Sequence, residues 1–500
     1  MDVCCSKNEP VPPSLATGPS GDGPCAITAS VCPVCLMPLE ARRVIREGDV
    51  FLQRSCPVHG SFSELVWSRR IDFSSWSNPE AASALSSCCG AAAAGDLAPG
   101  EARPTNALVG PPCPDGCRTC AQHETRPCCV LFEVTQRCNL SCPVCYADAG
   151  RSRLAKQAHA ATDVADPPLE AIAHWYDALR AVAGLCHIQI SGGEPTLRDD
   201  LEDIIRIGRD KGFSYFQLNT NGILLGEEPE RAQRLKEAGL TCVFLQFDGL
   251  DDEPVRLLRG RALREQKLAA IDACAVAGLP VVLVCTLAGG VNEHELMPIV
   301  EFGVSRCPVV RGVHVQPLAS FGRSDIPAPP RRMTIPDVLA LLEEQSGGMI
   351  SREHFSGGTA ENPYCSFNAN YLIDDEGRLV SVRPDGPSVG TCCGMPQADA
   401  VQRAQDTQAR RWGCDIGELG FGPLPPATLD GFLWRTKARG FSLTGMAFMD
   451  AETMDFDRLR RCYIFVMDAD GTLVPFCAYN LSSNNTPSHY RAARALHHYE

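Results

Sequence analysis

The chain has 500 residues and a formal net charge of −14, and 44% of its residues are apolar. A length of this order predicts about two to four domains with sizeable cores. The negative charge argues against a nucleic-acid partner held through its phosphates. No apolar run reaches the roughly 18 residues of a membrane span. We therefore expect a cytoplasmic protein, and peripheral contact with a membrane stays open.

The N-terminal part of the chain predicts a flexible tail followed by a metal-binding module. Residues 1–27 are rich in Pro, Gly and Ser and are expected to be disordered. Residues 28–75 contain "CPVC" and "CPVHG" around a strand-like stretch, which is typical of a zinc-ribbon or rubredoxin-like knuckle holding one zinc or iron. The predicted ligands are Cys32, Cys35, Cys56 and His59. A thiol-bearing loop without metal is the alternative.

Residues 76–110 are predicted to be a linker. Beyond them the sequence predicts alternating strands and helices. Helices are expected between the strands, for example at 199–211 and 262–277. This alternation predicts an α/β fold built on a parallel sheet, with functional side chains at the carboxyl ends of its strands. The predicted strands cover 130–135, 187–194, 215–222, 242–249, 280–290 and 312–319. The region after about 330 predicts one helix at 334–345 and hairpins at 370–382 and 463–476.

Cysteine is the distinctive residue of this sequence, with 27 copies. The N-terminus shows no charged-then-apolar signal segment, so a disulfide framework is the weaker interpretation. Thiolates at short spacing suit zinc or iron–sulfur clusters. Five isolated cysteines are instead expected to be small buried apolar residues, namely Cys186, Cys242, Cys274, Cys285 and Cys307.

The stretch "RCNLSCPVCYADAG" places Cys138, Cys142 and Cys145 directly after the first predicted strand. Four thiolates would close a structural site, whereas three leave one iron of a cluster open for reaction. "SGGEP" at 191–195 ends the second predicted strand. The two motifs, in this order and at these strand ends, resemble the signature of the radical S-adenosylmethionine (SAM) superfamily.

This resemblance implies a partial (β/α)6 TIM-like barrel over residues 130–325 and a [4Fe–4S] cluster held by the three cysteines. The open iron would bind SAM, which reduction cleaves to a 5′-deoxyadenosyl radical. A low-potential donor such as ferredoxin or flavodoxin would supply the electron.

The same resemblance assigns roles in SAM binding to residues at the strand ends. Gly192, Gly193 and Glu194 would meet the methionyl amino group, although a Glu-Pro pair is also a common helix start. Thr220 and Asp248 are candidates for the ribose, although polar residues at these places also cap the following helices.

A closer resemblance is to the tetraether lipid synthase family, which includes dihydro-hydroxymethylpterin methyltransferases. It is carried by the "CPVC…CPVHG" head, by "CPDGCRTCAQHETRPCCVLFEVTQRCNLSCPVCYA" and by "GMAFMDAETMDFDRLRRCYIFVMDADGTLVPFCAYN". It implies two auxiliary iron–sulfur clusters, one in an auxiliary segment at 111–129 and one in a C-terminal α+β domain at 326–500. The implied ligands are Cys113, Cys117, Cys120 and Cys128 or Cys129 for the first, and Cys365, Cys393, Cys462 and Cys477 for the second, with Cys392 and Cys414 as competitors.

Three functions follow from these patterns. The first is an enzyme that abstracts hydrogen from unactivated carbons and couples lipid hydrocarbon chains. The second is a radical SAM methyltransferase acting on a pterin or another small molecule. The third, an iron–sulfur electron carrier, explains the cysteines but neither "SGGEP" nor the six strand–helix units. Pocket shape decides between the first two, because a long apolar tunnel would favour lipid and a small polar cavity would favour a pterin.

Overall fold

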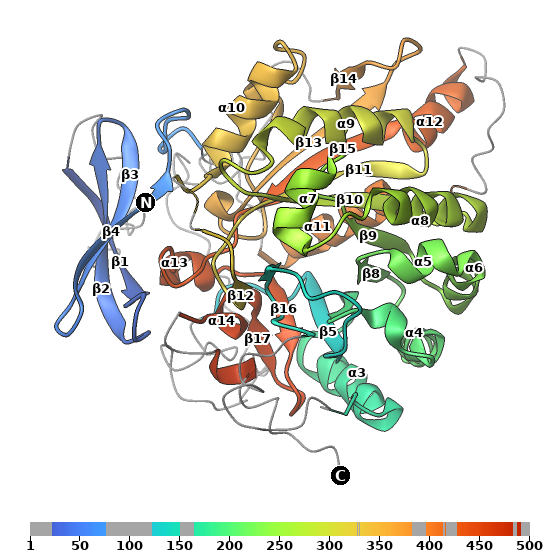
Figure 1. Cartoon of the computed structure of the whole chain (residues 1–500), viewed down its shortest axis with the longest axis horizontal. Coiled ribbons are helices and arrows are strands. Elements are labelled where there is room, and N and C mark those ends of the chain that lie inside the picture. Colours follow the sequence, from blue (N-terminus) through green and yellow to red (C-terminus); the bar gives the residue numbers. More distant parts are fainter. Residues whose placement is uncertain are drawn as a thin grey trace, which may run out of the picture.

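An eleven-stranded sheet carries the fold, and a four-stranded antiparallel sheet lies beside it (Figure 1). The computed structural model describes residues 23–76, 123–150, 165–327, 329, 331–382, 397–413, 416, 428–483 and 488–491. No helix in these ranges combines the length and the apolar character needed to cross a bilayer.

The four-stranded sheet is formed by the N-terminal module. Neighbouring strands pair in chain order through tight turns, and β1 begins inside the segment that the composition predicts as tail. The third strand buries every second residue, as expected for a sheet with one covered face. The strands are β1 (Gly23–Val31), β2 (Pro38–Arg46), β3 (Asp49–Cys56) and β4 (Gly60–Trp67).

Six parallel strands form the centre of the large sheet and confirm the predicted alternation. Their order in the sheet, β11-β10-β9-β8-β7-β5, follows their order in the chain. All seven residues of the first strand are buried, as is typical of a parallel strand covered on both faces. The strands are β5 (Cys129–Thr135), β7 (His187–Gly192), β8 (Phe216–Thr220), β9 (Cys242–Gln246), β10 (Val281–Leu287) and β11 (Val310–Pro317).

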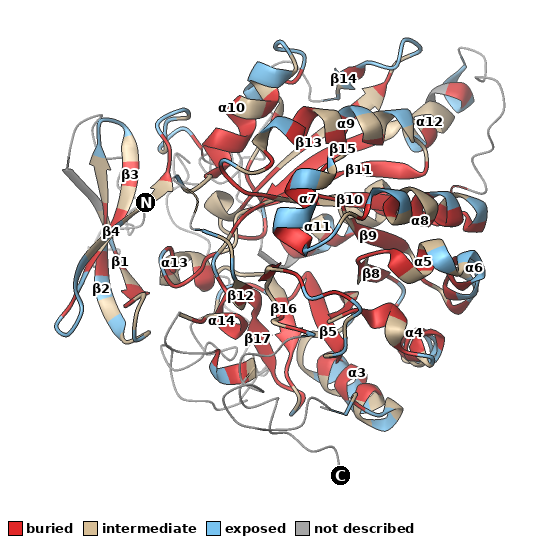
Figure 2. Cartoon of the chain, in the orientation of Figure 1, coloured by how far each residue is buried: buried red, intermediate tan, exposed pale blue. Residues whose placement is uncertain are grey.

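Most helices between these strands cover the outer face of the sheet, with their buried stripes turned toward it, whereas α7 packs on the cysteine loop through Val255 and Leu258 (Figure 2). In α3, the residues Ile172, Trp175, Tyr176 and Leu179 recur at helical spacing and are buried. The rings of Trp175 and Tyr176 pack on Phe132 of β5, with centroids 5.6 and 4.8 Å apart. The helices are α3 (Leu169–Ala183), α4 (Leu201–Asp210), α5 (Ile223–Glu227), α6 (Pro229–Ala238), α7 (Asp252–Arg259), α8 (Arg264–Ala277) and α9 (Leu296–Ser305).

The C-terminal region adds strands to both ends of this sheet. At one end β15 (Gly440–Met446) pairs in parallel with β11, followed by β13 (Ser366–Ile373) and β14 (Leu379–Ser381) in antiparallel pairing. At the other end β16 (Ile464–Met467) pairs in parallel with β5 and is followed by β17 (Leu473–Pro475). Both predicted hairpins are confirmed. The α+β region predicted at 326–500 thus continues the core sheet on each side.

Helix α11 (Gln397–Trp412) packs across the amino-terminal ends of the central strands. Gln405 donates to the carbonyl of Cys128 at 3.1 Å, and the Trp412 indole donates to Ser442 Oγ at 2.9 Å. Gln408 Oε1 lies 3.0 Å from Nδ1 of His187. The remaining helices of four or more residues are α10 (Ile335–Gln345), α12 (Leu429–Ala438), α13 (Phe456–Leu459) and α14 (Phe476–Tyr479).

The N-terminal module docks on the C-terminal region through a buried ion pair. Arg43 of β2 donates from Nε and a terminal nitrogen to the two carboxylate oxygens of Asp455, at 2.8 and 2.9 Å. Thr28 of β1 donates to the same carboxylate at 2.8 Å. A bidentate pair of this kind fixes orientation as well as distance.

We expect Arg43→Ala to loosen this docking. The change leaves the buried Asp455 without its cation, which typically costs about 3–5 kcal/mol. A protease should then separate the module from the rest of the chain faster than in the unmodified protein. The matched control is Arg42→Ala on the same strand, because the Arg42 side chain is 58% exposed. Equal cleavage rates in both variants would contradict the prediction.

Candidate functional site

A cavity of about 540 Å³ lies on the inner face of the sheet and joins the two predicted motifs. The three clustered cysteines line it, as do Gly192, Gly193, Glu194 and Thr220. The motifs therefore meet in space as their positions after successive parallel strands predict.

The cysteine triplet lies in the loop that follows β5. Cys138, Cys142 and Cys145 all line the cavity, and apolar side chains, among them Leu140 and Leu263, pack around them. Burial raises the pKa of Cys138 to about 12, and the neighbouring Glu194 and the other two thiols also raise it. Thiolates here require a source of positive charge, which the irons of a cluster supply. The donor set thus fits a [4Fe–4S] cluster with one open iron.

Arg323 fixes the course of this loop, and sequence reasoning missed it. Its guanidinium donates to the carbonyls of Cys142 at 2.7 Å and Ala149 at 2.9 Å, and it pairs with Asp148 at 3.0 Å. The arginine lies in β12 (Arg323–Ser324), which pairs with β6 (Val144–Cys145). A lone arginine far along the chain gives no local sign of this contact.

The glycines of "SGGEP" pack directly on the backbone that leads into the cysteine loop. The N–H of Gly193 donates to Thr135 O and that of Glu194 to Arg137 O, both at 2.8 Å. A Cβ added at Gly192 would lie 2.2 Å from Thr135 O, and one at Gly193 would lie 2.1 Å from Arg137 O. Only glycine allows this approach.

The Glu194 carboxylate lines the cavity and is held from several directions. It accepts from Thr220 Oγ1 and from the N–H of Asn221, each at 2.7 Å. It also accepts from the N–H of Thr196 at 3.1 Å and so caps the short helix Pro195–Leu197. The helix-start interpretation is therefore correct as far as the cap is concerned. Thr220 orients this carboxylate.

Asp248 lies behind the wall of the cavity. Its carboxylate accepts from Nε and a terminal nitrogen of Arg259, at 2.7 and 2.9 Å, and from the N–H of Thr286 at 2.9 Å. Burial opposes the charge of Arg259, but Asp248 outweighs it and raises the pKa of the guanidinium. Arg259 itself lines the cavity and donates to Val144 O at 3.0 Å. The structure thus places Arg259, which the sequence did not single out, between Asp248 and the cavity.

A second group of cysteines gathers where the two ends of the large sheet approach each other. Cys365 precedes β13, Cys462 precedes β16 and Cys477 follows β17. Burial raises the pKa of Cys477 to about 12, and Cys365 is near enough to raise it further. Arg458 donates to Cys365 Sγ at 3.4 Å. Three of the four ligands assigned to the C-terminal auxiliary cluster therefore lie in one region, but their sulfur atoms are not all within 4.8 Å of one another.

Of the ligands assigned to the first auxiliary cluster, only Cys128 and Cys129 lie in the described residues. Cys128 and Cys129 are buried at the start of β5, and Cys129 lines the cavity, where Gln189 donates to its sulfur at 3.2 Å. The remaining assigned or competing ligands lie outside the described residues, namely Cys113, Cys117, Cys120, Cys392, Cys393 and Cys414.

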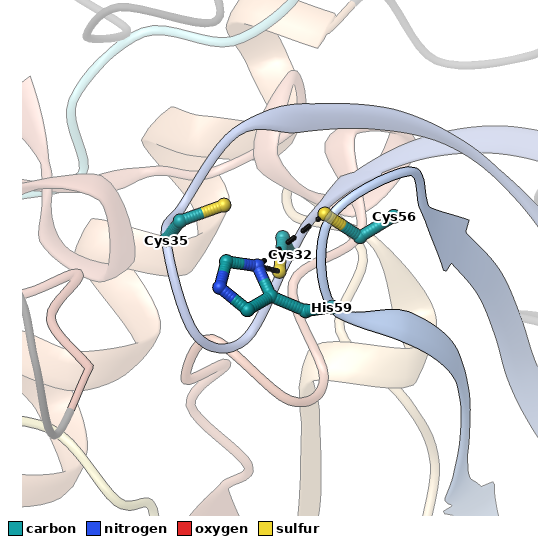
Figure 3. A group of neighbouring side chains, drawn as sticks. All are labelled: Cys32, Cys35, Cys56 and His59. Carbon is teal, nitrogen blue, oxygen red and sulfur yellow. Dashed lines mark hydrogen bonds between the residues drawn. The ribbon is translucent and has the colours of Figure 1, made fainter.

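The N-terminal module brings its four predicted ligands together (Figure 3). The ligand atoms of Cys32, Cys35, Cys56 and His59 all lie within 4.8 Å of one another. His59 Nδ1 is 3.5 Å from the sulfurs of both Cys32 and Cys56. Burial raises the pKa of Cys56, but the N–H groups of Val58 and His59 and the His59 ring lower it to about 6. The donor set fits one tetrahedral metal ion.

Comparison with known protein families finds two matching segments in the chain. Residues 132–303 match the family described as "Radical SAM superfamily", and residues 25–68 match the "HMPTM N-terminal zinc ribbon domain". A 7,8-dihydro-6-hydroxymethylpterin dimethyltransferase of Methanocaldococcus jannaschii is 29% identical over 502 aligned positions, covering 91% of this chain and 93% of that enzyme.

Other relatives share only part of the chain. A GTP 3′,8-cyclase of Corynebacterium glutamicum is 33% identical, but the match covers 42% of this chain and 54% of the cyclase. Among solved structures, SuiB of Streptococcus suis overlaps with a TM-score of 0.36 at 15% identity, covering 46% of this chain and 47% of that one.

A parallel α/β sheet with a three-cysteine loop and a glycine-rich motif at adjacent strand ends defines a radical SAM enzyme. The chain contains a radical SAM domain over residues 132–303 and an N-terminal zinc ribbon domain over residues 25–68. Its cofactors are accordingly SAM, a [4Fe–4S] cluster and a metal ion in the ribbon.

We expect Cys142→Ala to abolish reductive cleavage of SAM, because two thiolates cannot hold a cluster in the reactive geometry. The measurement is formation of 5′-deoxyadenosine by anaerobically reconstituted protein with SAM and dithionite. Cys274→Ala is the matched control, since Cys274 is a buried cysteine on α8 with no assigned ligand role. A comparable rate in both variants would show that the triplet does not hold the reactive cluster.

Loss of one ligand should empty the zinc ribbon and leave the iron content unchanged. Cys35→Ala removes one of four donors, so about one metal ion per chain should be lost in elemental analysis. Cys274→Ala again serves as the control. Full metal retention by Cys35→Ala would contradict the assignment of Cys35.

Proposed function

We propose that this protein is a radical SAM methyltransferase acting on a pterin or a closely similar small nitrogen heterocycle. The observation that carries the proposal is a set of amide side chains in the cavity wall beyond the cysteine triplet. The similarity to the pterin dimethyltransferase over 91% of the chain supports the same substrate class.

Amide side chains from successive strands point into this cavity. They come from β7, β8, β9 and β11, and they are Gln189, Gln217, Asn219, Gln246 and Gln316. Four of these amides hydrogen-bond within the protein, and a facing hydrocarbon chain would leave their remaining donors and acceptors unsatisfied, at a cost of about 1–3 kcal/mol per group. A heterocycle rich in N–H, NH₂ and C=O groups satisfies them. The lining therefore favours the pterin interpretation over lipid coupling.

Aromatic rings form another part of the wall, near the cysteine triplet. Phe476 packs on Phe448 with centroids 4.5 Å apart, and Phe321 and Tyr146 lie close to the same ring. All four side chains line the cavity. Flat apolar faces of this kind would hold a planar bicyclic ligand by stacking and keep water from the reacting atoms.

The bound cofactors would supply the electron, the hydrogen abstraction and the methyl group. The chain's own side chains would position the partners. Glu194, held by Thr220 and Asn221, offers a carboxylate for the amino group of SAM. Tyr146 contributes a hydroxyl that lies 2.6 Å from Ser191 Oγ at the cavity wall. Ferredoxin or flavodoxin remains the proposed electron donor.

We also keep the two auxiliary clusters within this proposal. The grouping of Cys365, Cys462 and Cys477 supports the C-terminal one, with Cys393 as the proposed fourth ligand. Cys113, Cys117, Cys120 and either Cys128 or Cys129 are proposed for the other. Three clusters predict about 12 irons per chain after full reconstitution, and about four irons would remove the auxiliary assignments.

The test is an anaerobic reaction of reconstituted protein with SAM, dithionite and 7,8-dihydro-6-hydroxymethylpterin. We expect the pterin to gain the mass of one or two CH₂ groups, with formation of S-adenosylhomocysteine and 5′-deoxyadenosine. Cys142→Ala should give no product, and Cys274→Ala should match the unmodified protein. Loss of hydrogens from added phospholipid chains, with the pterin untouched, would overturn the proposal.

A further inference from the structure

A buried carboxylate lies in the cavity wall at a distance from the cysteine triplet. Glu361 is 4% exposed and lines the cavity. It is close enough to Cys129, at the start of β5, to raise the pKa of that thiol, whereas the triplet follows the end of the same strand. Seven residues of strand separate the two places by about 20 Å. Glu361 therefore lies toward the opposite end of β5 from the cysteine triplet.

The position of this carboxylate is fixed by its neighbours. Ser366 donates its hydroxyl to Glu361 Oε1, and the side chain of Tyr463 also hydrogen-bonds the carboxylate. A Cβ added at Gly358 would lie 1.9 Å from Oε1, so the loop accommodates the carboxylate only because this residue is glycine. The group is thus held in one place rather than free to turn toward solvent.

Arg461 is near enough to Glu361 to lower the pKa of its carboxyl, but no salt bridge joins these two side chains. Burial raises the pKa of this carboxyl, and the hydroxyls that donate to it only partly offset the effect. A carboxylate accepts about four hydrogen bonds. It therefore retains acceptor capacity toward the cavity, which a ligand with N–H donors would fill.

The guanidinium of Arg411 lies in the same part of the cavity wall. Arg411 of α11 lines the cavity, contacts Asn368 Oδ1 at 3.4 Å and lies near Tyr463. Burial lowers the pKa of its guanidinium to about 10, so it is protonated at neutral pH. An acceptor and a donor thus both line the cavity, and each interacts with Tyr463. Their combination suits a ligand whose edge presents N–H donors next to a carbonyl oxygen.

We propose that Glu361 binds the 2-amino and N3–H groups of a 2-amino-4-oxopyrimidine ring, with Arg411 facing the 4-oxo group. This inference rests on the proposed function and specifies how the heterocycle is recognised and oriented. Holding the pyrimidine edge at Glu361 turns the opposite ring toward the cysteine triplet. In 7,8-dihydro-6-hydroxymethylpterin, that ring carries the saturated carbon and the hydroxymethyl group, which would face the bound SAM.

The first experiment measures binding to the reconstituted protein by equilibrium dialysis. The ligands are 6-hydroxymethylpterin and its lumazine counterpart, in which a 2-oxo group replaces the 2-amino group. The unmodified protein should prefer the pterin by about 10- to 100-fold, because the lumazine places an acceptor against the carboxylate. Equal affinity for both would overturn the role of Glu361 while leaving a pterin-binding enzyme in place. Binding of neither compound would overturn the proposed function together with this subsite.

The second experiment compares Glu361→Gln with Glu237→Gln, an exposed change on α6. Glu361→Gln should weaken pterin binding by about 10- to 100-fold and reduce the preference over lumazine, since the amide offers one acceptor and one donor. Cleavage of SAM without substrate should persist, which reports that the cluster site is assembled. Unchanged pterin affinity in Glu361→Gln would overturn the inference, and the ligand comparison on the unmodified protein decides it if this variant does not fold.

Discussion

The backbone contact between the ends of β5 and β7 is the constraint on which the site depends. Gly192 and Gly193 lie so close to Thr135 and Arg137 that no side chain fits between them. The strand end that would bind SAM is thereby fixed to the strand end that leads into the cysteine loop. Glu194, the next residue, donates its own N–H to Arg137 O and turns its carboxylate into the same cavity. One close approach therefore sets the relative position of both halves of the cofactor site.

Buried arginines stabilise the surroundings of this contact. Arg259 and Arg323 each donate to carbonyls of the cysteine loop while a carboxylate balances their charge. Strand pairing in this loop covers only the two residues Val144 and Cys145 of β6, and side-chain donors satisfy further carbonyls, among them that of Cys142. The positive charge of both residues also lies near the place where a cluster with thiolate ligands would add negative charge.

The C-terminal region both completes the sheet and shapes the cavity. It supplies strands to each end of the parallel core, and Cys365, Cys462 and Cys477 gather where these ends approach. Glu361 precedes Cys365 in the chain, and Arg411 lies on α11. Both residues line the cavity at a distance from the cysteine triplet. The residues proposed for substrate recognition and the cysteines assigned to the C-terminal auxiliary cluster therefore both lie in the C-terminal region, whereas the SAM motifs lie at the ends of the central strands.

The sequence by itself determined the elements that depend on local pattern. Six apolar stretches alternating with helices predicted the parallel core, and the spacing of Cys138, Cys142 and Cys145 predicted a site with an open iron. "CPVC" and "CPVHG" likewise predicted the group around His59, because the β1–β2 and β3–β4 connections that carry these ligands belong to one small sheet of neighbouring strands. Only the tertiary structure decided that Asp248 is shielded by Arg259, that Arg323 holds the cysteine loop and that strands after residue 365 extend the core sheet. These contacts join residues that are far apart in the sequence. A single arginine or a short strand has no sequence pattern that identifies the residues it contacts. The polar lining of the cavity is of the same kind, since each strand contributes only one or two of its side chains.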